Sequence, residues 1–366
     1  MGTEQFERLK SELAERAIKV RKYIFSKVDG IHLEPADLRT AVTDYLRYGG
    51  KMLRPGVLLF SCGAVGGNEE TALPAAAAIE LFHTWTLVHD DIIDQDEKRR
   101  GQDALHHRYY KKACQNLDLN LTDEQARHYG QSISILTGDT QHGLAISLLT
   151  ELFFANGVDP KVVLLLIREL DYTVLNTLVS GETLDVLYSR LPIEKLTEAQ
   201  IKAMLWGKTG ALYEFAGRAG ALIGLNTADL HHPYVQAISS FTSKCGLAFQ
   251  LLDDILGIIG DEKKLGKPVG SDIREGKKTI IVFQALKHAN QQQRKKLLNG
   301  LGNNFISSSD YTEIVELIQE LGGIEFTKNI AHTYLTEALE ALTIIPQSKF
   351  KDLLETWAHY MINRES

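Results

Sequence analysis

Cysteine is scarce in this chain, with three residues among 366, at Cys62, Cys114 and Cys245. They lie too far apart in the sequence to suggest either a thiolate zinc site or a disulfide framework. Proteins that use no disulfides are typical of reducing compartments, so we expect a cytoplasmic location.

Long apolar runs and targeting signals are also missing. The longest uncharged apolar stretches, such as 55–66 and 162–167, are shorter than the roughly 18 residues that span a bilayer. The first ten residues are charged from the outset and lack the apolar centre of a secretory signal. We therefore expect no transmembrane segment.

Neither sign of charge is in large excess. The chain has 40 Lys and Arg residues against 47 Asp and Glu residues, a net charge of −7. Such a chain has no general attraction for nucleic acid or for anionic lipid, so nucleic acid is not an expected partner. Any anionic ligand must be held by local groups of basic residues.

Proline is rare as well, with eight residues, and no segment shows a sustained alternation of apolar and polar positions. Apolar residues instead recur at helical spacing, which predicts an all-α protein. The expected helices cover 4–27, 36–48, 55–67, 71–96, 101–115, 123–155, 160–189, 194–222, 228–260, 278–299, 309–321, 326–343 and 348–362. No linker rich in Ser, Gly or Pro divides the chain, so we expect one large helical domain over residues 1–366.

One long segment, 260–278, has no apolar periodicity and contains four glycines and Pro268. Loops of this length in compact domains usually have a function. The segment does not match the phosphate-binding P-loop, because Pro268 follows Lys267 where that motif requires Ser or Thr.

A first acidic cluster, Asp90, Asp91 and Asp94, lies in the expected helix 71–96. Asp94 follows Asp90 by four positions, which places the two about 40° apart around a helix and one turn apart along it. Carboxylates at that spacing repel one another. A divalent cation removes the repulsion, and magnesium typically binds one or two carboxylates together with substrate phosphate oxygens.

A second acidic pair, Asp253 and Asp254, lies near the end of another apolar helix, far along the chain. One such pair is also compatible with an exposed helix face or a helix cap. Two of them on apolar helices, accompanied by basic residues, predict opposite walls of one cavity.

Basic residues occur near both acidic clusters and in the long loop. They are Lys51, Arg54, Arg99, Arg100, Lys208, Lys267 and Lys277. Each alone is compatible with a solvated surface charge, but together they predict two bound polyanions, one held through metal and one by direct contacts. His83 shares the helix face of Asp90, and both a structural and a ligand-binding role fit it. No HExxH zinc pattern and no GxSxG nucleophile pattern occurs.

Four motifs occur in the order found in a known family. They are GGKMLRP, ELFHTWTLVHDDIIDQDEKRRG, GKTG and FQLLDDILGIIGDEKKLGKPVGSDIREGKKT. In them the chain resembles the trans-isoprenyl diphosphate synthases, also called polyprenyl synthetases, over about residues 45–280. It looks most like the archaeal short-chain enzymes that make geranylgeranyl or farnesyl diphosphate. The resemblance implies an isoprenoid synthase fold, a single bundle of long antiparallel helices around a deep central cavity, and usually a homodimer.

The resemblance also implies roles for individual residues. A site for three Mg²⁺ ions on the allylic diphosphate would be formed by Asp90, Asp91, Asp94, Asp253 and Asp254. The same diphosphate would contact Arg99, Lys208 and Lys267. Isopentenyl diphosphate would be bound by Lys51, Arg54, His83 and Arg100. Beside the developing carbocation would lie Thr209 and Gln250, and the loop would be closed over the site by Lys277.

The implied reaction is the condensation of isopentenyl diphosphate with allylic diphosphates of five to fifteen carbons. The allylic C–O bond ionises, the double bond of isopentenyl diphosphate attacks the cation, and a proton is lost. Product length in the family depends on positions that Trp85 and Thr86 occupy here. A large and a small residue in this order resemble enzymes that make the C20 product, geranylgeranyl diphosphate, with C15 as the alternative. By helix geometry alone, Trp85 is equally compatible with a core or dimer contact.

Two positions depart from the family pattern. Gly257 stands where a third Asp is common in the second motif, and Asp261 is a candidate substitute one turn further on. Met52 stands where a basic residue is common. Two other functions stay open. A class I terpene cyclase also ionises an allylic diphosphate with magnesium on helical carboxylates, and Gly257 leaves open a non-catalytic regulatory subunit of a prenyl synthase.

Overall fold

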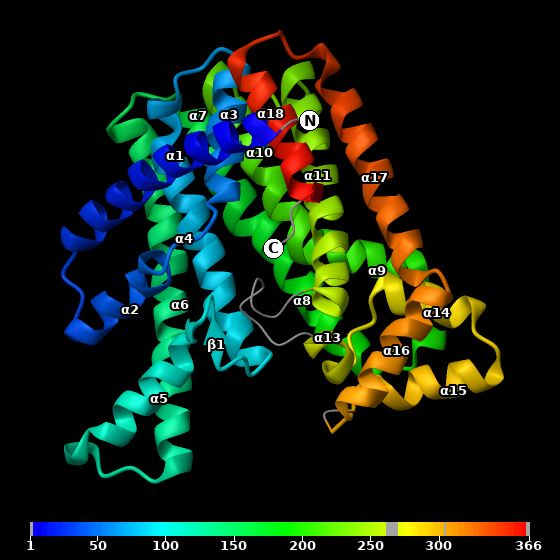
Figure 1. Cartoon of the computed structure of the whole chain (residues 1–366). Coiled ribbons are helices and arrows are strands. Elements are labelled where there is room, and N and C mark those ends of the chain that lie inside the picture. Colours follow the sequence, from blue (N-terminus) through cyan, green and yellow to red (C-terminus); the bar gives the residue numbers. More distant parts are fainter. Residues whose placement is uncertain (1–2, 261–269, 304, 364–366) are drawn as a thin grey trace. The chain divides into compact units, whose positions relative to one another are not determined.

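The computed structural model describes residues 3–260, 270–303 and 305–363, and in this part the chain is all-α, as the sequence predicts (Figure 1). The strands of the described part are two short segments, β1 (Lys98–Arg99) and β2 (Gln102–Asp103), which pair antiparallel. Contacts divide the chain into two compact units. The amino-terminal unit contains the residues up to Ile167 together with Ala219–Ala228, and the carboxy-terminal unit contains Arg168–Arg218 and the residues from Asp229 onward.

The amino-terminal unit is built from the first seven α-helices and the end of α10. Its elements are α1 (Thr3–Asp29), α2 (Ala36–Arg47), α3 (Leu53–Ala64), α4 (Glu69–Ile93), α5 (Leu105–Gln115), a 3-10 turn (Leu117–Leu119), α6 (Asp123–Phe154), α7 (Pro160–Arg168) and the last part of α10 (Ala211–Leu225).

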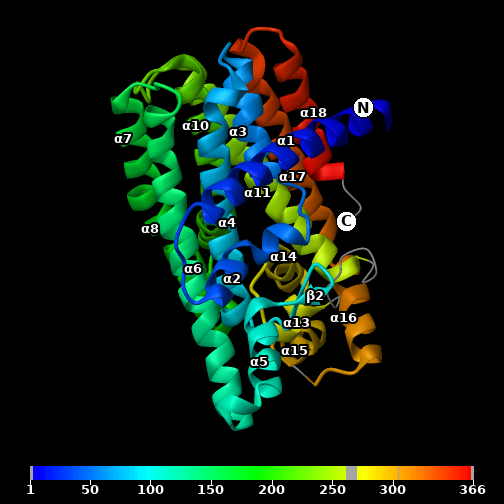
Figure 2. The same cartoon turned by 90° about the vertical axis from the view of Figure 1, so that its left-hand side faces the viewer.

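Helices α4 and α6 pack side by side, and α5 lies along the amino-terminal half of α6 (Figure 1, Figure 2). α4 forms a core helix because apolar residues cover nearly its whole circumference, including the buried run 75–79. The side chain of Asn68 caps its start by accepting a hydrogen bond from the Glu70 amide. Thr122 and Gln125 form the reciprocal capping box expected at the start of α6. These caps fix where the two central helices begin.

The carboxy-terminal unit contains the remaining elements. They are a π-helical turn (Glu169–Val174), α8 (Leu175–Arg190), a 3-10 turn (Ile193–Lys195), α9 (Glu198–Leu205), a second π-helical turn (Trp206–Gly210), the start of α10, α11 (Pro233–Ile259), α13 (Ser271–Glu275), α14 (Ile280–His288), α15 (Gln291–Gly300), α16 (Ser308–Glu320), α17 (Gly323–Ala341), a 3-10 turn (Leu342–Ile344) and α18 (Lys349–Asn363).

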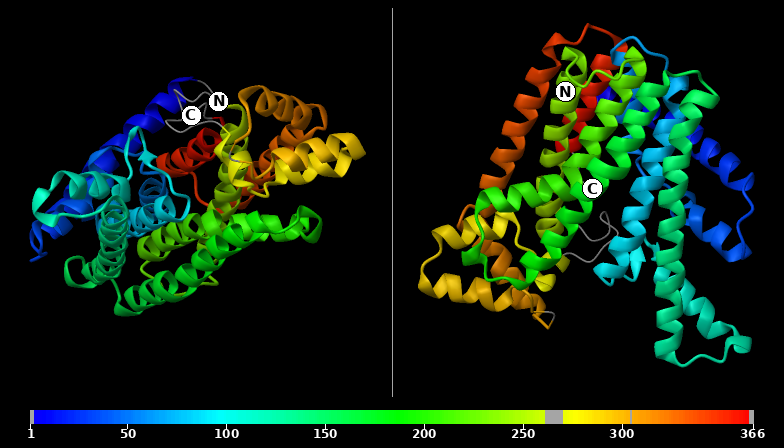
Figure 3. Two further views of the ribbon diagram at one scale, coloured as in Figure 1. Left: turned by 90° about the horizontal axis from the view of Figure 1, so that it is seen from below. Right: turned by 180° about the vertical axis from the view of Figure 1, so that it is seen from behind.

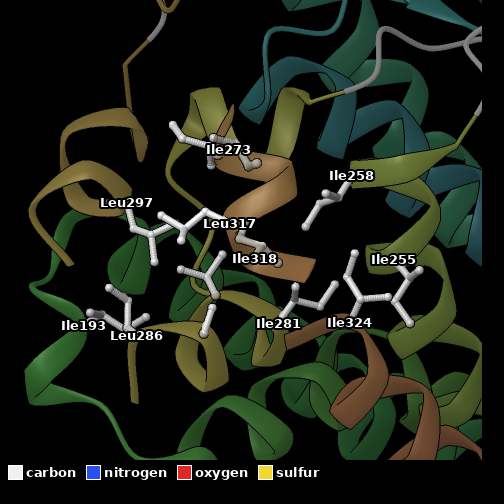
Figure 4. Packing of buried hydrophobic residues seen from close by; sticks show 13 residues of the cluster. Ile193, Ile255, Ile258, Ile273, Ile281, Leu286, Leu297, Leu317, Ile318 and Ile324 are labelled. Carbon is white, nitrogen blue, oxygen red and sulfur yellow. The ribbon is translucent and has the colours of Figure 1, made fainter. Parts of the chain in front are cut away.

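Helix α11 is the centre of this unit and packs against α17 and α18, while α14 and α16 gather at one end of α17 (Figure 1, Figure 3). Figure 4 shows the aliphatic cluster that joins the carboxyl end of α11 to α13, α14 and α16. Ile255 and Ile258 enter it from α11, and Ile273 enters it from α13. The segment that carries the second acidic pair is therefore held by a continuous apolar core.

The structure corrects several expected boundaries. The helix expected over 278–299 is two helices, because Asn290 and Gln293 form a capping box that starts α15. The helix expected from residue 101 begins at Leu105, since the preceding residues form the β1–β2 ribbon. The segment 260–278 contains the short helix α13. Within the described ranges, no helix combines the length and apolar character needed to cross a bilayer. A single domain over 1–366 stays a prediction.

Candidate active site

The first acidic cluster lies at the carboxyl end of α4, in the amino-terminal unit. Asp90 and Asp91 belong to the last turn of the helix, and Asp94 is its C-cap, with its amide donating to the Asp90 carbonyl at 2.8 Å. Asp90 and Asp94 are half-buried and Asp91 is fully buried. One helix end therefore presents all three carboxylates, as the spacing predicts.

Asp91 is the centre of a buried polar network. One of its oxygens accepts a hydrogen bond from Arg99 Nε at 2.7 Å, and the other accepts one from the Tyr45 hydroxyl. The Tyr45 hydroxyl in turn accepts from the Leu105 amide at 2.9 Å. Burial raises the pKa of Asp91, and the Arg99 charge opposes that rise. Asp91 thereby holds Arg99, whose guanidinium also lies 3.7 Å from an oxygen of Asp90. No sequence motif pointed to Tyr45.

Arginines from other elements lie near His83, which is on α4 seven positions before Asp90. Arg54 Nη1 is 3.1 Å from His83 Nε2. Burial and the charges of Arg54 and Arg100 lower the pKa of His83 well below its usual value. A neutral His83 accepts a hydrogen bond from Arg54 at Nε2 and carries its own proton on Nδ1. His83 thus orients Arg54 without adding a positive charge.

Glycines in GGKMLRP allow Arg100 to lie against the backbone. Arg100 donates to the Gly49 carbonyl, and a Cβ on Gly50 would lie 2.7 Å from Arg100 Nη1. Gly50 also has φ +130°, where a side chain is strained. The buried Glu80, which the sequence analysis missed, is near the same arginines. Burial raises its pKa to about 7, although Arg100, Arg54 and Arg21 lower it. Lys51, in the same motif, is exposed.

Trp85 and Thr86 take different places on α4. The Trp85 ring contacts Phe82, at 4.9 Å between centroids, and His142 of α6, at 5.1 Å. Gly138 of α6 makes room, since a Cβ there would lie 3.0 Å from Trp85 Cδ1. The Thr86 hydroxyl donates to the His83 carbonyl at 2.7 Å. Trp85 therefore packs between α4 and α6, and its role in product length stays a prediction.

In the carboxy-terminal unit, Lys208 lies in the π-helical turn after α9 and contacts two acids of α8. Its Nζ is 2.7 Å from Asp185 and 2.9 Å from Glu182. Gly181 permits this approach, because a Cβ there would overlap the Lys208 backbone nitrogen. The sequence motifs include neither Glu182 nor Asp185, because two acids three positions apart are common on helix faces.

A chain of hydrogen bonds joins Thr209, the residue after Lys208, to the second acidic pair. The Thr209 hydroxyl donates to Gln250 Oε1 at 2.7 Å, and Gln250 Nε2 donates to Asp254 Oδ1 at 2.9 Å. Asp254 is 6% exposed, and its Oδ2 has no hydrogen-bond partner in the described part of the chain. Burial, followed by the charges of Asp272, Asp253 and Asp185, raises the pKa of Asp254 well above its usual value.

Asp254 and the acids around it fit a divalent cation. The cation would bind the buried oxygen of Asp254 and reduce the repulsion among their negative charges. No group of three potential metal ligands converges among residues 3–260, 270–303 and 305–363. Lys277 lies 3.0 Å from Glu275 and 3.5 Å from Asp272. Lys267 and Asp261 lie outside the described residues.

Comparison with known proteins gives consistent results. The family model described as polyprenyl synthetase matches residues 35–318. A geranylgeranyl diphosphate synthase of Sulfolobus acidocaldarius is 36% identical over 298 residues, covering 80% of each chain. The crystal structure of a geranylgeranyl pyrophosphate synthetase from Pyrococcus horikoshii superposes with a TM-score of 0.82 at 34% identity, covering 98% of this chain and 99% of that one. A geranylgeranyl pyrophosphate synthase from Corynebacterium glutamicum, complexed with isoprenyl diphosphate and magnesium, gives 0.81 at 25% identity, covering 98% and 99%.

Proposed function

The chain belongs to the polyprenyl synthetase family, and from that premise we propose that it is a short-chain trans-prenyltransferase. It condenses isopentenyl diphosphate with allylic diphosphates of five to fifteen carbons. The observation that carries the proposal is the chain of hydrogen bonds from Thr209 through Gln250 to Asp254. These bonds begin at Thr209, the neighbour of Lys208 in the GKTG motif, and end at the buried carboxylate of Asp254, which fits a metal ion. Lys208 is the residue that we assign to the allylic diphosphate.

Two groups of residues divide the work between the substrates. Arg99 and Lys208 bind the allylic diphosphate and stabilise the negative charge that grows on it as the C–O bond breaks. Isopentenyl diphosphate is held close to the cation by Arg54, His83, Arg100 and Lys51. The two reactants are therefore already positioned when the double bond attacks. The new C–C bond forms, the adjacent proton leaves, and the departing pyrophosphate accepts it. No side-chain nucleophile is required.

The residues that would hold magnesium are Asp90, Asp91, Asp94, Asp253 and Asp254. Bound there, Mg²⁺ would neutralise charge on the departing pyrophosphate. The related enzyme complexed with isoprenyl diphosphate and magnesium supports this choice of ion, and three ions is the number we propose. Asp91 would also hold Arg99 in place, since its carboxylate accepts hydrogen bonds from Arg99 and Tyr45.

We propose geranylgeranyl diphosphate, C20, as the main product and farnesyl diphosphate, C15, as the alternative. The support is the Trp85 and Thr86 pair on α4 and the names of the archaeal relatives. Thr209 and Gln250 would lie beside the carbocation. Lys267 and Lys277 would act from the long loop.

The test is chromatography of products made by the purified protein with Mg²⁺, isopentenyl diphosphate and C5, C10 or C15 allylic diphosphate. We expect C20 from every primer and none without isopentenyl diphosphate. Product formed from the allylic substrate alone would indicate a terpene cyclase. Absence of product, with an altered output of another prenyl synthase on mixing, would indicate a regulatory subunit.

We also propose a homodimer, a single synthase domain over 1–366 and a cytoplasmic location. Exposed apolar residues support the dimer. On α8 and the turn before it they are Tyr172, Val179, Val186 and Leu187. Their burial against a second copy would remove an apolar surface from water.

A further inference from the structure

Arg99 and Arg100 are neighbours in the sequence, but the proposed function assigns them to different diphosphates. They lie where the β1–β2 ribbon turns, since Arg99 pairs with Gln102, and Arg100 and Gly101 form the two-residue turn between the strands. Both turn residues have positive φ, +53° for Arg100 and +74° for Gly101. Glycine or asparagine usually occupies such positions, so an arginine there is strained. Contacts made by the Arg100 side chain can offset this strain.

Tyr45 of α2 contacts the supports of both arginines through different parts of one residue. Its hydroxyl donates to Asp91, whose other oxygen accepts a hydrogen bond from Arg99 Nε at 2.7 Å. Its main-chain carbonyl accepts a hydrogen bond from Arg100 Nη1 at 3.4 Å. The same nitrogen of Arg100 donates to the Gly49 carbonyl. The side chain of Tyr45 thus acts on Arg99, and its backbone acts on Arg100.

Packing and hydrogen bonds fix the direction of the Tyr45 hydroxyl. Tyr45 is 5% exposed, and its ring lies in an apolar cluster with Val88, Leu105 and Tyr109. The hydroxyl also accepts a hydrogen bond from the Leu105 amide at 2.9 Å, in the first turn of α5. That amide is one of the donors that a helix leaves without an intrahelical partner. With a donor on one side and a carboxylate on the other, the hydroxyl has one orientation that satisfies both.

We propose that Tyr45 is a positioning residue that orients Arg99 through its hydroxyl and Arg100 through its carbonyl, and that it serves the two diphosphates separately. The inference rests on the proposed function and deepens it. The hydroxyl acts on the allylic diphosphate, because it keeps the Asp91 carboxylate turned toward Arg99. The carbonyl acts on isopentenyl diphosphate, because it directs the guanidinium of Arg100.

Tyr45→Phe removes the hydroxyl and keeps the carbonyl, so it separates the two effects. Calorimetry measures the dissociation constants of two probes, isopentenyl diphosphate alone and the allylic analogue geranyl S-thiodiphosphate with Mg²⁺. We expect Tyr45→Phe to weaken binding of the analogue about tenfold, as for other residues that orient a binding group, and that of isopentenyl diphosphate by no more than about twofold. Equal weakening of both probes, or of neither, would overturn the proposal.

Tyr109→Phe is the matched control. Tyr109 lies in the same apolar cluster and is 4% exposed, but its hydroxyl donates to the Asp37 carbonyl at 2.8 Å. It should lower the midpoint of denaturant unfolding about as much as Tyr45→Phe does and leave both dissociation constants unchanged. If Tyr109→Phe lost as much analogue binding as Tyr45→Phe, any hydroxyl lost from this cluster would have the same effect, and the role of Tyr45 would be overturned.

Gly50→Ala tests the carbonyl side by itself. A Cβ on Gly50 would lie 2.7 Å from Arg100 Nη1 and push the guanidinium away from the Tyr45 carbonyl. Gly49→Ala is its control, because Gly49 also has positive φ, +85°, but nothing lies within 4 Å of its added Cβ. We expect isopentenyl diphosphate to bind about tenfold more weakly to Gly50→Ala than to Gly49→Ala, and the analogue to bind both equally. Equal binding of isopentenyl diphosphate would overturn the role of the carbonyl. Wild-type protein that binds neither probe would overturn the proposed function as well.

Discussion

Glu80 is a buried acid whose ionisation depends on the arginines around it. Burial raises its pKa to about 7, although Arg100, Arg54 and Arg21 lower it. The folded protein therefore holds a proton on Glu80 between pH 4.5 and 7, where the unfolded chain has released it. Stability contributed by this group falls as pH rises through that window and is constant above it. The full span is about 3 kcal/mol.

The prediction is that Glu80→Gln removes this dependence, because glutamine does not titrate. Denaturant unfolding of both proteins at pH 5 and pH 8 measures it. The difference in unfolding free energy between variant and wild type should favour the variant more at pH 8 than at pH 5. A difference that is the same at both pH values would show that Glu80 does not titrate in the folded state within this range.

Trp85 tests the assignment of product length at the scale of one side chain. Trp85→Ser removes a half-buried ring packed on Phe82 and His142. If the ring limits chain growth, products longer than C20 should appear in chromatography of the reaction. The unfolding free energy should fall by about 2–4 kcal/mol, as for other large aromatic truncations.

The control for Trp85 is Phe154→Ser, since Phe154 is an aromatic residue 77% exposed at the end of α6. It should change neither product length nor stability appreciably. A folded Trp85→Ser protein that yields the wild-type distribution would leave Trp85 as a packing residue between α4 and α6.

At the scale of elements, the close packing of α8 against the second π-helical turn (Trp206–Gly210) requires that position 181 has no side chain. A Cβ there would overlap the Lys208 backbone nitrogen and lie 2.7 Å from the Gly207 carbonyl carbon. Gly181→Ala should force the turn away from α8 and move Lys208 from Asp185. We expect a stability loss of about 1–3 kcal/mol and a KM for the allylic diphosphate raised about tenfold, measured by denaturation and steady-state kinetics.

Gly143→Ala is the matched control for Gly181→Ala. Gly143 is also within a helix, α6, but nothing lies within 4 Å of its added Cβ. Alanine there should raise stability by about 0.5–1 kcal/mol through helix propensity. If both variants gained stability equally, the close approach of α8 to the π-helical turn would not matter.

The helices could be predicted because apolar periodicity and caps are local. The capping box at Thr122 is an example, whereas the break before α15 depends on the Asn290 cap inside a run that reads as one helix. The acidic clusters were likewise visible as motifs. Their partners were not, because Tyr45 and Asp185 reach the site through packing between segments far apart in sequence.

Association of whole molecules is tested on the exposed face of α8. Val179 is 47% exposed and stands seven positions before Val186, which is also exposed, so the two lie on one stripe of α8. Tyr172, in the π-helical turn before α8, is exposed as well. Val179→Glu places a charge in that stripe, and burying it against a second copy would be unfavourable. We expect sedimentation to show a dimer for wild type and a monomer for Val179→Glu at the same concentration. Phe305→Glu, a change at an isolated residue that is 96% exposed, should leave the dimer intact. A Val179→Glu protein that sediments as a dimer would exclude this stripe as the interface. An interface that buries Val179 would have to bury the new carboxylate, and the dimer would then dissociate.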